Sequence, residues 1–110
     1  MIDGLGTSRA DLEARWLQLT RAMLPAVAAD RGWPVRLDHC FQRILLDNAV
    51  GGRWYDAVTA RPAYRHVAFD ALARAVALGH AAIAGEADLS DLNRRSLAWR
   101  RAASANIGDE

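Results

Sequence analysis

The chain has 110 residues, of which 52% are hydrophobic and 25% are charged, the proportions of an ordinary soluble globular domain. A domain of this length can bury a sufficient core without disulfides or structural metals. The formal net charge is only +1, so attraction to nucleic acid or to an anionic membrane would require a local patch. All 14 basic residues are arginine, whose guanidinium forks onto carboxylates and phosphates.

Cysteine usage and hydropathy indicate the cellular compartment in which the protein is expected. Cys40 is the single cysteine, which excludes an internal disulfide and favours a reducing environment. No apolar stretch approaches the roughly 20 residues that span a bilayer. Residues 1–11 lack the basic flank and the apolar run of a signal peptide. We therefore expect a cytoplasmic protein that does not enter membranes.

The first predicted helix begins at Thr7 or Ser8, where a hydroxyl can cap free amide groups, and ends at Gly32. Pro25 lies inside this segment, so the helix either kinks there or restarts. The apolar residues recur every three or four positions and define one helical face: Leu12, Trp16, Leu19, Met23 and Val27.

The second predicted helix runs from about Leu37 to Val50 and stops at Gly51 and Gly52. A short helical turn is expected over residues 54–58, followed by a loop over residues 59–64. The third helix spans about residues 68–84 and ends at Gly85. Its inward side carries Phe69, Leu72, Val76, Gly79 and Ile83.

The fourth predicted helix runs from residue 89 or 90 to residue 102, with Leu89, Leu92, Ser96 and Trp99 facing inward. No segment shows the alternation of a β-strand. The sequence therefore predicts an all-α fold, a compact bundle of four main helices plus a short helical turn, with no sheet. Residues 8–103 form the single domain, and residues 1–7 and 104–110 are expected to be flexible ends.

A candidate binding surface lies on the second helix. His39, Arg43 and Asp47 follow one another at intervals of four residues, beside an apolar side formed by Leu37, Phe41, Ile44 and Leu45. Arg43 can pair with Asp47 at this spacing. One interpretation is a solvated helix edge. Another is the wall of a binding site, in which Arg43 meets an anion, Asp47 orients Arg43 and His39 donates a hydrogen bond.

Catalysis or metal binding is a third interpretation, and it would use His39 and Cys40. Adjacent residues on a helix point in different directions, which disfavours a shared metal or a nucleophile–base pair. His66 is expected to be exposed, and His80 to be a hydrogen-bonded residue at the edge of the core. The sequence does not decide whether these four side chains converge, and it assigns no metal, no cofactor and no catalytic residue.

The aromatic residues bear on the same surface. Trp16 and Trp99 are expected to seal the core, whereas Trp33 and Trp54 can either seal it or face a partner. We expect Trp54 and Tyr64 to lie near His39, Arg43 and Asp47 and to complete a binding surface for a ligand or partner.

The fourth helix offers an alternative surface. Arg94 and Arg101 point away from its apolar face, and Arg95 lies to one side. These arginines can oppose the negative end of the helix dipole, or they can contact the phosphates of a nucleic acid.

Three segments, "RGWPVRLDHCFQRILLDNAVGGRWYD", "RPAYR" and "GEADLSDLNRRSLAWR", carry a resemblance that covers most of residues 9–101. The chain resembles a group of short, uncharacterised bacterial proteins, some of which are labelled GCN5-related N-acetyltransferase. The label implies a mixed sheet and an Arg/Gln-x-x-Gly-x-Gly/Ala loop for acetyl-CoA. "NAVGGRW" does not match that loop, so no acetyltransferase site residue is carried over.

The sequence thus favours a small cytoplasmic helical binding or regulatory protein that contacts a macromolecular partner or a small anionic ligand. Nucleic-acid binding through Arg94, Arg95 and Arg101 is the alternative, and an acyltransferase-related protein is a further one by label alone. An enzyme would lose turnover on Cys40→Ser or His39→Ala without unfolding. A homodimer is also compatible with this number of tryptophans.

Overall fold

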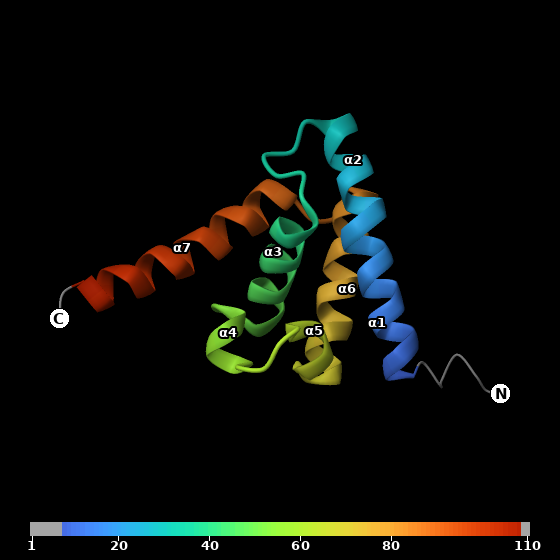
Figure 1. Cartoon of the computed structure of the whole chain (residues 1–110). Coiled ribbons are helices and arrows are strands. Elements are labelled where there is room, and N and C mark those ends of the chain that lie inside the picture. The colour runs from blue at the N-terminus through green and yellow to red at the C-terminus, as the bar shows by residue number, and fades with distance from the viewer. Residues whose placement is uncertain (1–7, 109–110) are drawn as a thin grey trace.

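Every regular element of residues 8–108, the part of the chain that this computed structural model describes, is a helix (Figure 1). Side chains are described for residues 8–102. Thr7 and the predicted flexible end 1–7 lie outside the described residues. The elements are α1 (Arg9–Gln18), η2 (Leu19–Met23), α2 (Leu24–Arg31), α3 (Asp38–Val50), α4 (Trp54–Ala57), α5 (Ala63–His66), α6 (Phe69–Ala84) and α7 (Leu89–Gly108).

Helices α1, η2 and α2 form one continuous rod (Figure 1). It begins where the Ser8 hydroxyl accepts a 3.0 Å hydrogen bond from the amide of Asp11, as the capping pattern predicts. η2 is a π-helix, and the amide of Leu24 donates to the carbonyl of Leu19, five residues earlier. Pro25 lies in the first turn of α2, where it needs no amide donor. Thus the chain takes a wider turn and restarts its α-helix before the proline.

Three glycines end the predicted helices where the sequence places the stops. Gly32, Gly51 and Gly85 have φ values of 65°, 78° and 82°, in the left-handed region that costs glycine little. Each follows the last residue of α2, α3 or α6 directly. These terminators, together with the four long helical segments, confirm the predicted all-α bundle.

The core forms where α6 packs against α3 and against the rod of α1, η2 and α2. Gly79 makes the close approach, because a Cβ there would overlap Leu19 Cδ2 and lie 3.2 Å from Leu45 Cδ1. The fully buried large side chains come from all four long segments, which gives one continuous core: Trp16, Leu19, Leu24, Phe41, Ile44, Leu45, Leu72 and Leu89.

Some predicted details are wrong. Leu37 is 58% exposed because it precedes α3 with an extended backbone and leaves the helical face. Phe69 is 44% exposed at the first turn of α6. The predicted loop over residues 59–64 ends early, since α5 begins at Ala63 behind Pro62, whose ring fits the position before a first helical turn.

α7 is longer than predicted. It continues past residue 102 to Gly108, because the alanine-rich segment after Trp99 favours helix and contains no glycine or proline before residue 108. The first part of α7 lies across α3, and its C-terminal half projects away from the other helices (Figure 1). Among the helices in the described residues, none has both the length and the apolar character needed to cross a membrane.

Candidate ligand-binding cleft

A cleft with a volume of about 520 Å³ opens where η2, α3, α4 and α5 meet. We call it the arginine cleft, because three arginines from separate segments contribute to its wall. It is lined by Trp16, Arg21, His39, Gln42, Arg43, Leu46, Trp54, Arg61, Pro62, Ala63 and Tyr64.

Four of the five residues predicted to form a binding surface line this cleft. His39 and Arg43 come from α3, Trp54 from α4 and Tyr64 from α5. The fifth, Asp47, is not in the wall and has no exposed surface. The structure therefore brings together the predicted cation, histidine and aromatic residues, and places the predicted carboxylate behind them.

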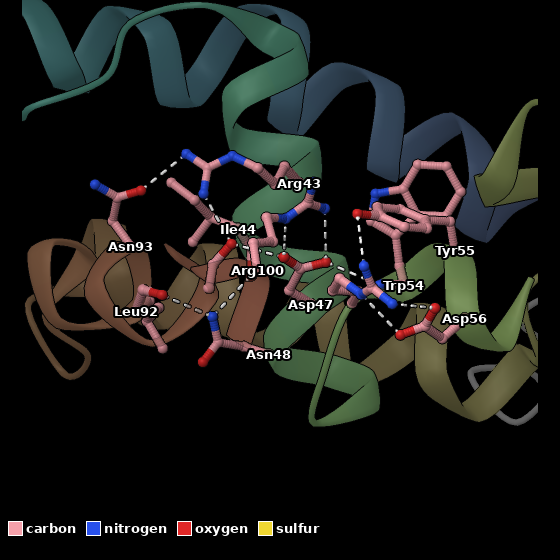
Figure 2. Close-up of polar contacts among 12 residues, drawn as sticks. Arg43, Ile44, Asp47, Asn48, Trp54, Tyr55, Asp56, Leu92, Asn93 and Arg100 are labelled. Carbon is pink, nitrogen blue, oxygen red and sulfur yellow. Dashed lines mark hydrogen bonds and ion pairs between the residues drawn. The ribbon is translucent and has the colours of Figure 1, made fainter. Parts of the chain in front are cut away.

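The predicted pair between Arg43 and Asp47 is not formed, because α7 supplies nearer partners for both side chains. Asp47 accepts hydrogen bonds from the Ser96 hydroxyl at 2.6 Å and from Arg100 Nε at 2.8 Å and Nη2 at 3.1 Å. It also accepts a 2.9 Å hydrogen bond from the backbone amide of Trp54 (Figure 2). Asp47 thus holds α7 and the start of α4 against α3.

Arg43 is turned toward α7 as well. Its Nη1 donates to Ser96 Oγ and its Nη2 to Asn93 Oδ1, each at 2.8 Å (Figure 2). The group of Arg43, Asp47, Asn93, Ser96 and Arg100 is named the α3–α7 cluster. It joins two helices through side chains about 50 positions apart, which helical periodicity within α3 does not reveal.

The α3–α7 cluster carries an excess of positive charge, because Arg43 and Arg100 both lie near a single carboxylate, that of Asp47. Burial lowers the pKa of Arg43 below its ordinary value, and the charge of Arg100 lowers it further, whereas Cys40 and Asp47 act in the opposite direction. Arg43 also lines the cleft. An anion in the cleft would therefore meet a guanidinium whose charge is only partly compensated.

The other two arginines of the cleft come from outside the predicted strip. Arg21 lies in the π-helix η2, and its Nε is 3.9 Å from Asp38 Oδ2. Arg61 lies over the ring of Trp54, with 5.0 Å between the guanidinium carbon and the ring centroid. His39 is 73% exposed, and its Nδ1 is 3.8 Å from Asp38 Oδ1. None of the described residues that line the cleft is acidic.

The apolar wall includes Trp16, which is completely buried in the core, as expected, and also borders the cleft. Its Nε1 is the buried side-chain donor that has no hydrogen-bond partner among the described residues. Nearby, Gln42 Nε2 donates to Thr20 Oγ1 at 3.1 Å, and Thr20 Oγ1 donates to the carbonyl of Trp16 at 2.9 Å.

The sequence did not indicate Arg21, Gln42 or Arg61. An exposed arginine next to a buried threonine gives no distinct signal in a helical pattern. The π-turn that places Arg21 at the cleft also has no sequence signature beyond the proline that follows it. Arg61 had one available signal, since it stands directly before Pro62 and three residues before Tyr64, an aromatic residue already assigned to the site.

The other candidate residues lie apart from this cleft. His66 is exposed, as expected, but His80 is also exposed and is not a core-edge residue, because the buried side of α6 runs through Val76, Gly79 and Ala82. Within the described part of the chain, no group of three or more His, Cys, Asp or Glu side chains is placed to hold a metal ion.

The remaining tryptophans take different positions. Trp33 packs edge-on against Phe41, with 6.2 Å between the ring centroids, and is half-buried. Trp99 is half-buried and lies outside the group of side chains that pack in or against the core, so it does not seal the core as predicted. Thus Trp33 mainly covers Phe41, and Trp54, the first residue of α4, lines the cleft.

The three arginines of α7 that could contact a nucleic acid are exposed, but two of them are already paired. Arg94 Nη2 lies 2.6 Å from Asp91 Oδ1, and Arg95 Nη2 lies 3.2 Å from Asp91 Oδ2. The hydrogen bond from Arg94, supported by the charge of Arg95, lowers the pKa of Asp91. Arg101 is exposed further along the helix. The structure does not bring these side chains together with the arginine cleft.

No protein-family model, curated protein or solved structure matches this chain. The geometry of the cleft and of the α3–α7 cluster is therefore the basis for a functional assignment.

Proposed function

We propose that this protein binds a small anionic ligand in the arginine cleft. The observation that carries the proposal is the convergence of Arg21, Arg43 and Arg61 with His39 on one cavity whose described lining has no acidic side chain. Guanidinium groups recognise carboxylates and phosphates through paired, charge-assisted hydrogen bonds.

Arg43 supports this proposal because it still has donors to offer. A guanidinium has five N–H donors, and hydrogen bonds to Ser96 and Asn93 use Nη1 and Nη2 without exhausting them. A bound anion would also offset the excess positive charge of the α3–α7 cluster. Since Arg43 contacts both the cleft and α7, occupancy of the cleft would reach α7, which supports a regulatory role rather than a catalytic one.

The proposed setting is the cytoplasm. The single cysteine, which is partly exposed, supports it, because such a thiol is better tolerated in a reducing compartment.

The test is a titration with inorganic phosphate and with acetate, followed by the melting temperature and by calorimetry. We expect each anion to raise the melting temperature in a saturable way. The Arg61→Ala substitution should weaken the binding affinity about 10-fold, the loss expected for one charge-assisted hydrogen bond. Arg36→Ala is the matched control, because Arg36 is exposed and outside the cleft wall. Equal effects of the two substitutions, or no saturable binding of either anion, would contradict the proposal.

A further inference from the structure

The size of the arginine cleft exceeds what a bare inorganic ion requires. Its volume of about 520 Å³ is within the range of roughly 300–1,000 Å³ that is typical of sites for organic ligands. A water molecule, by comparison, occupies about 30 Å³ in the liquid. An ion held by the arginines would leave most of the cleft unfilled, and the rest of the wall includes Leu46, Pro62 and Ala63, which an ion does not contact favourably.

Aromatic side chains form much of that remaining wall. Trp16, Trp54 and Tyr64 all line the cleft. Rings in such walls pack well against a flat ligand, because aromatic pairs gain from offset-stacked and edge-to-face contacts in addition to the burial of their area. The carbon-rich part of the cleft therefore favours a planar ring over a flexible alkyl chain.

We propose that the ligand is an aromatic acid, a flat apolar ring that carries an anionic group, with the anion at the arginines and the ring against Trp54 and Tyr64. This inference rests on the proposed anion binding. A carboxylate and a phosphate monoester share the required chemistry, and the arms of the experiment distinguish them.

The experiment compares probes by isothermal titration calorimetry on the full chain: 2-naphthoate, 2-naphthyl phosphate, neutral 2-naphthamide and acetate. We expect one of the two aromatic anions to bind on the order of 10–100-fold more tightly than acetate, the gain from burying a ring of this kind. The better of the two identifies the anionic group. The neutral amide is expected to bind at least 10-fold more weakly than the better aromatic anion.

The outcomes separate the two proposals. If acetate binds as tightly as the aromatic anions, the aromatic ligand is wrong and anion binding stands. If the neutral amide binds as tightly as they do, both are wrong. Absence of binding by every probe likewise overturns both.

Two substitutions test the placement of the ring. Tyr64→Leu is expected to weaken the aromatic anions at least 5-fold and to leave acetate unchanged, whereas Phe69→Leu, an exposed ring on α6 outside the cleft wall, changes neither. Unchanged affinity of the aromatic anions for Tyr64→Leu would contradict the placement.

Discussion

Replacing Asp47 by alanine removes the acceptor that joins α7 and the start of α4 to α3. The carboxylate is completely buried and accepts hydrogen bonds from Ser96, from two nitrogens of Arg100 and from the backbone amide of Trp54. After the substitution, Arg100 and Arg43 remain close to one another with no compensating charge.

The magnitude follows from the burial of this ion pair. Removing one partner of a buried pair costs about 3–5 kcal/mol of unfolding free energy. The side chain of Arg100 is still 25% exposed, so solvent screens the remaining charge and the lower end, about 3 kcal/mol, applies. The total free energy of unfolding of a domain of this size is about 5–15 kcal/mol. The melting temperature should fall by roughly 12–24 °C, at about 4–8 °C per kcal/mol.

The assay is urea denaturation and thermal melting followed by far-ultraviolet circular dichroism. Asp70→Ala is the matched control, because Asp70 is 77% exposed and its contact with Arg74 is a surface pair, so we expect a loss below about 1 kcal/mol. Asp47→Asn keeps the shape and one acceptor oxygen, and its loss should be intermediate. If Asp47→Ala is as stable as Asp70→Ala, the α3–α7 cluster does not hold the fold together.

Other substitutions test separate contacts. Gly79→Val is expected to cost about 2 kcal/mol or more, measured by urea denaturation, because its side chain would overlap Leu19; full stability would show that α6 has room there. Ser8→Ala should lower the free energy of unfolding by about 1 kcal/mol through loss of the N-cap, and no change would mean that the cap does not stabilise the helix. The pKa of Asp91 is lowered by Arg94, so its contribution is present above the unfolded pKa of about 3.9 and is lost as pH falls through the lower native pKa. Comparing wild type with Asp91→Asn in melts between about pH 2 and 6 should therefore show a difference that closes at the acid end; a difference independent of pH would contradict this.

The helices could be predicted from the sequence because their signals are local. Apolar spacing fixes the buried side of each helix, and a glycine after the last turn fixes its end, as at Gly32, Gly51 and Gly85. The π-turn before Pro25 and the full length of α7 were not predicted. The π-turn depends on how the rod packs against the other helices. The length of α7 depends on helix propensity beyond the last inward-facing residue.

The candidate site could be predicted only in part, for a physical reason. A helical projection gives the direction of a side chain but not what covers it. His39, Arg43 and Asp47 share one strip of α3, yet α7 covers Asp47 and leaves His39 exposed. Arg21 and Arg61 reach the cleft from distant segments, and only the tertiary arrangement brings them to Arg43.

The most direct test of the arginine cleft uses the indole N–H resonances of the four tryptophans, recorded by nuclear magnetic resonance during a titration with 2-naphthoate. Trp16 and Trp54 line the cleft, whereas Trp33 and Trp99 lie outside its wall. Binding in the cleft is expected to give saturable shifts of the Trp16 and Trp54 resonances, assigned by single substitution, while the other two remain in place. Shifts confined to Trp33 and Trp99, equal shifts of all four, or no shift at all would contradict it.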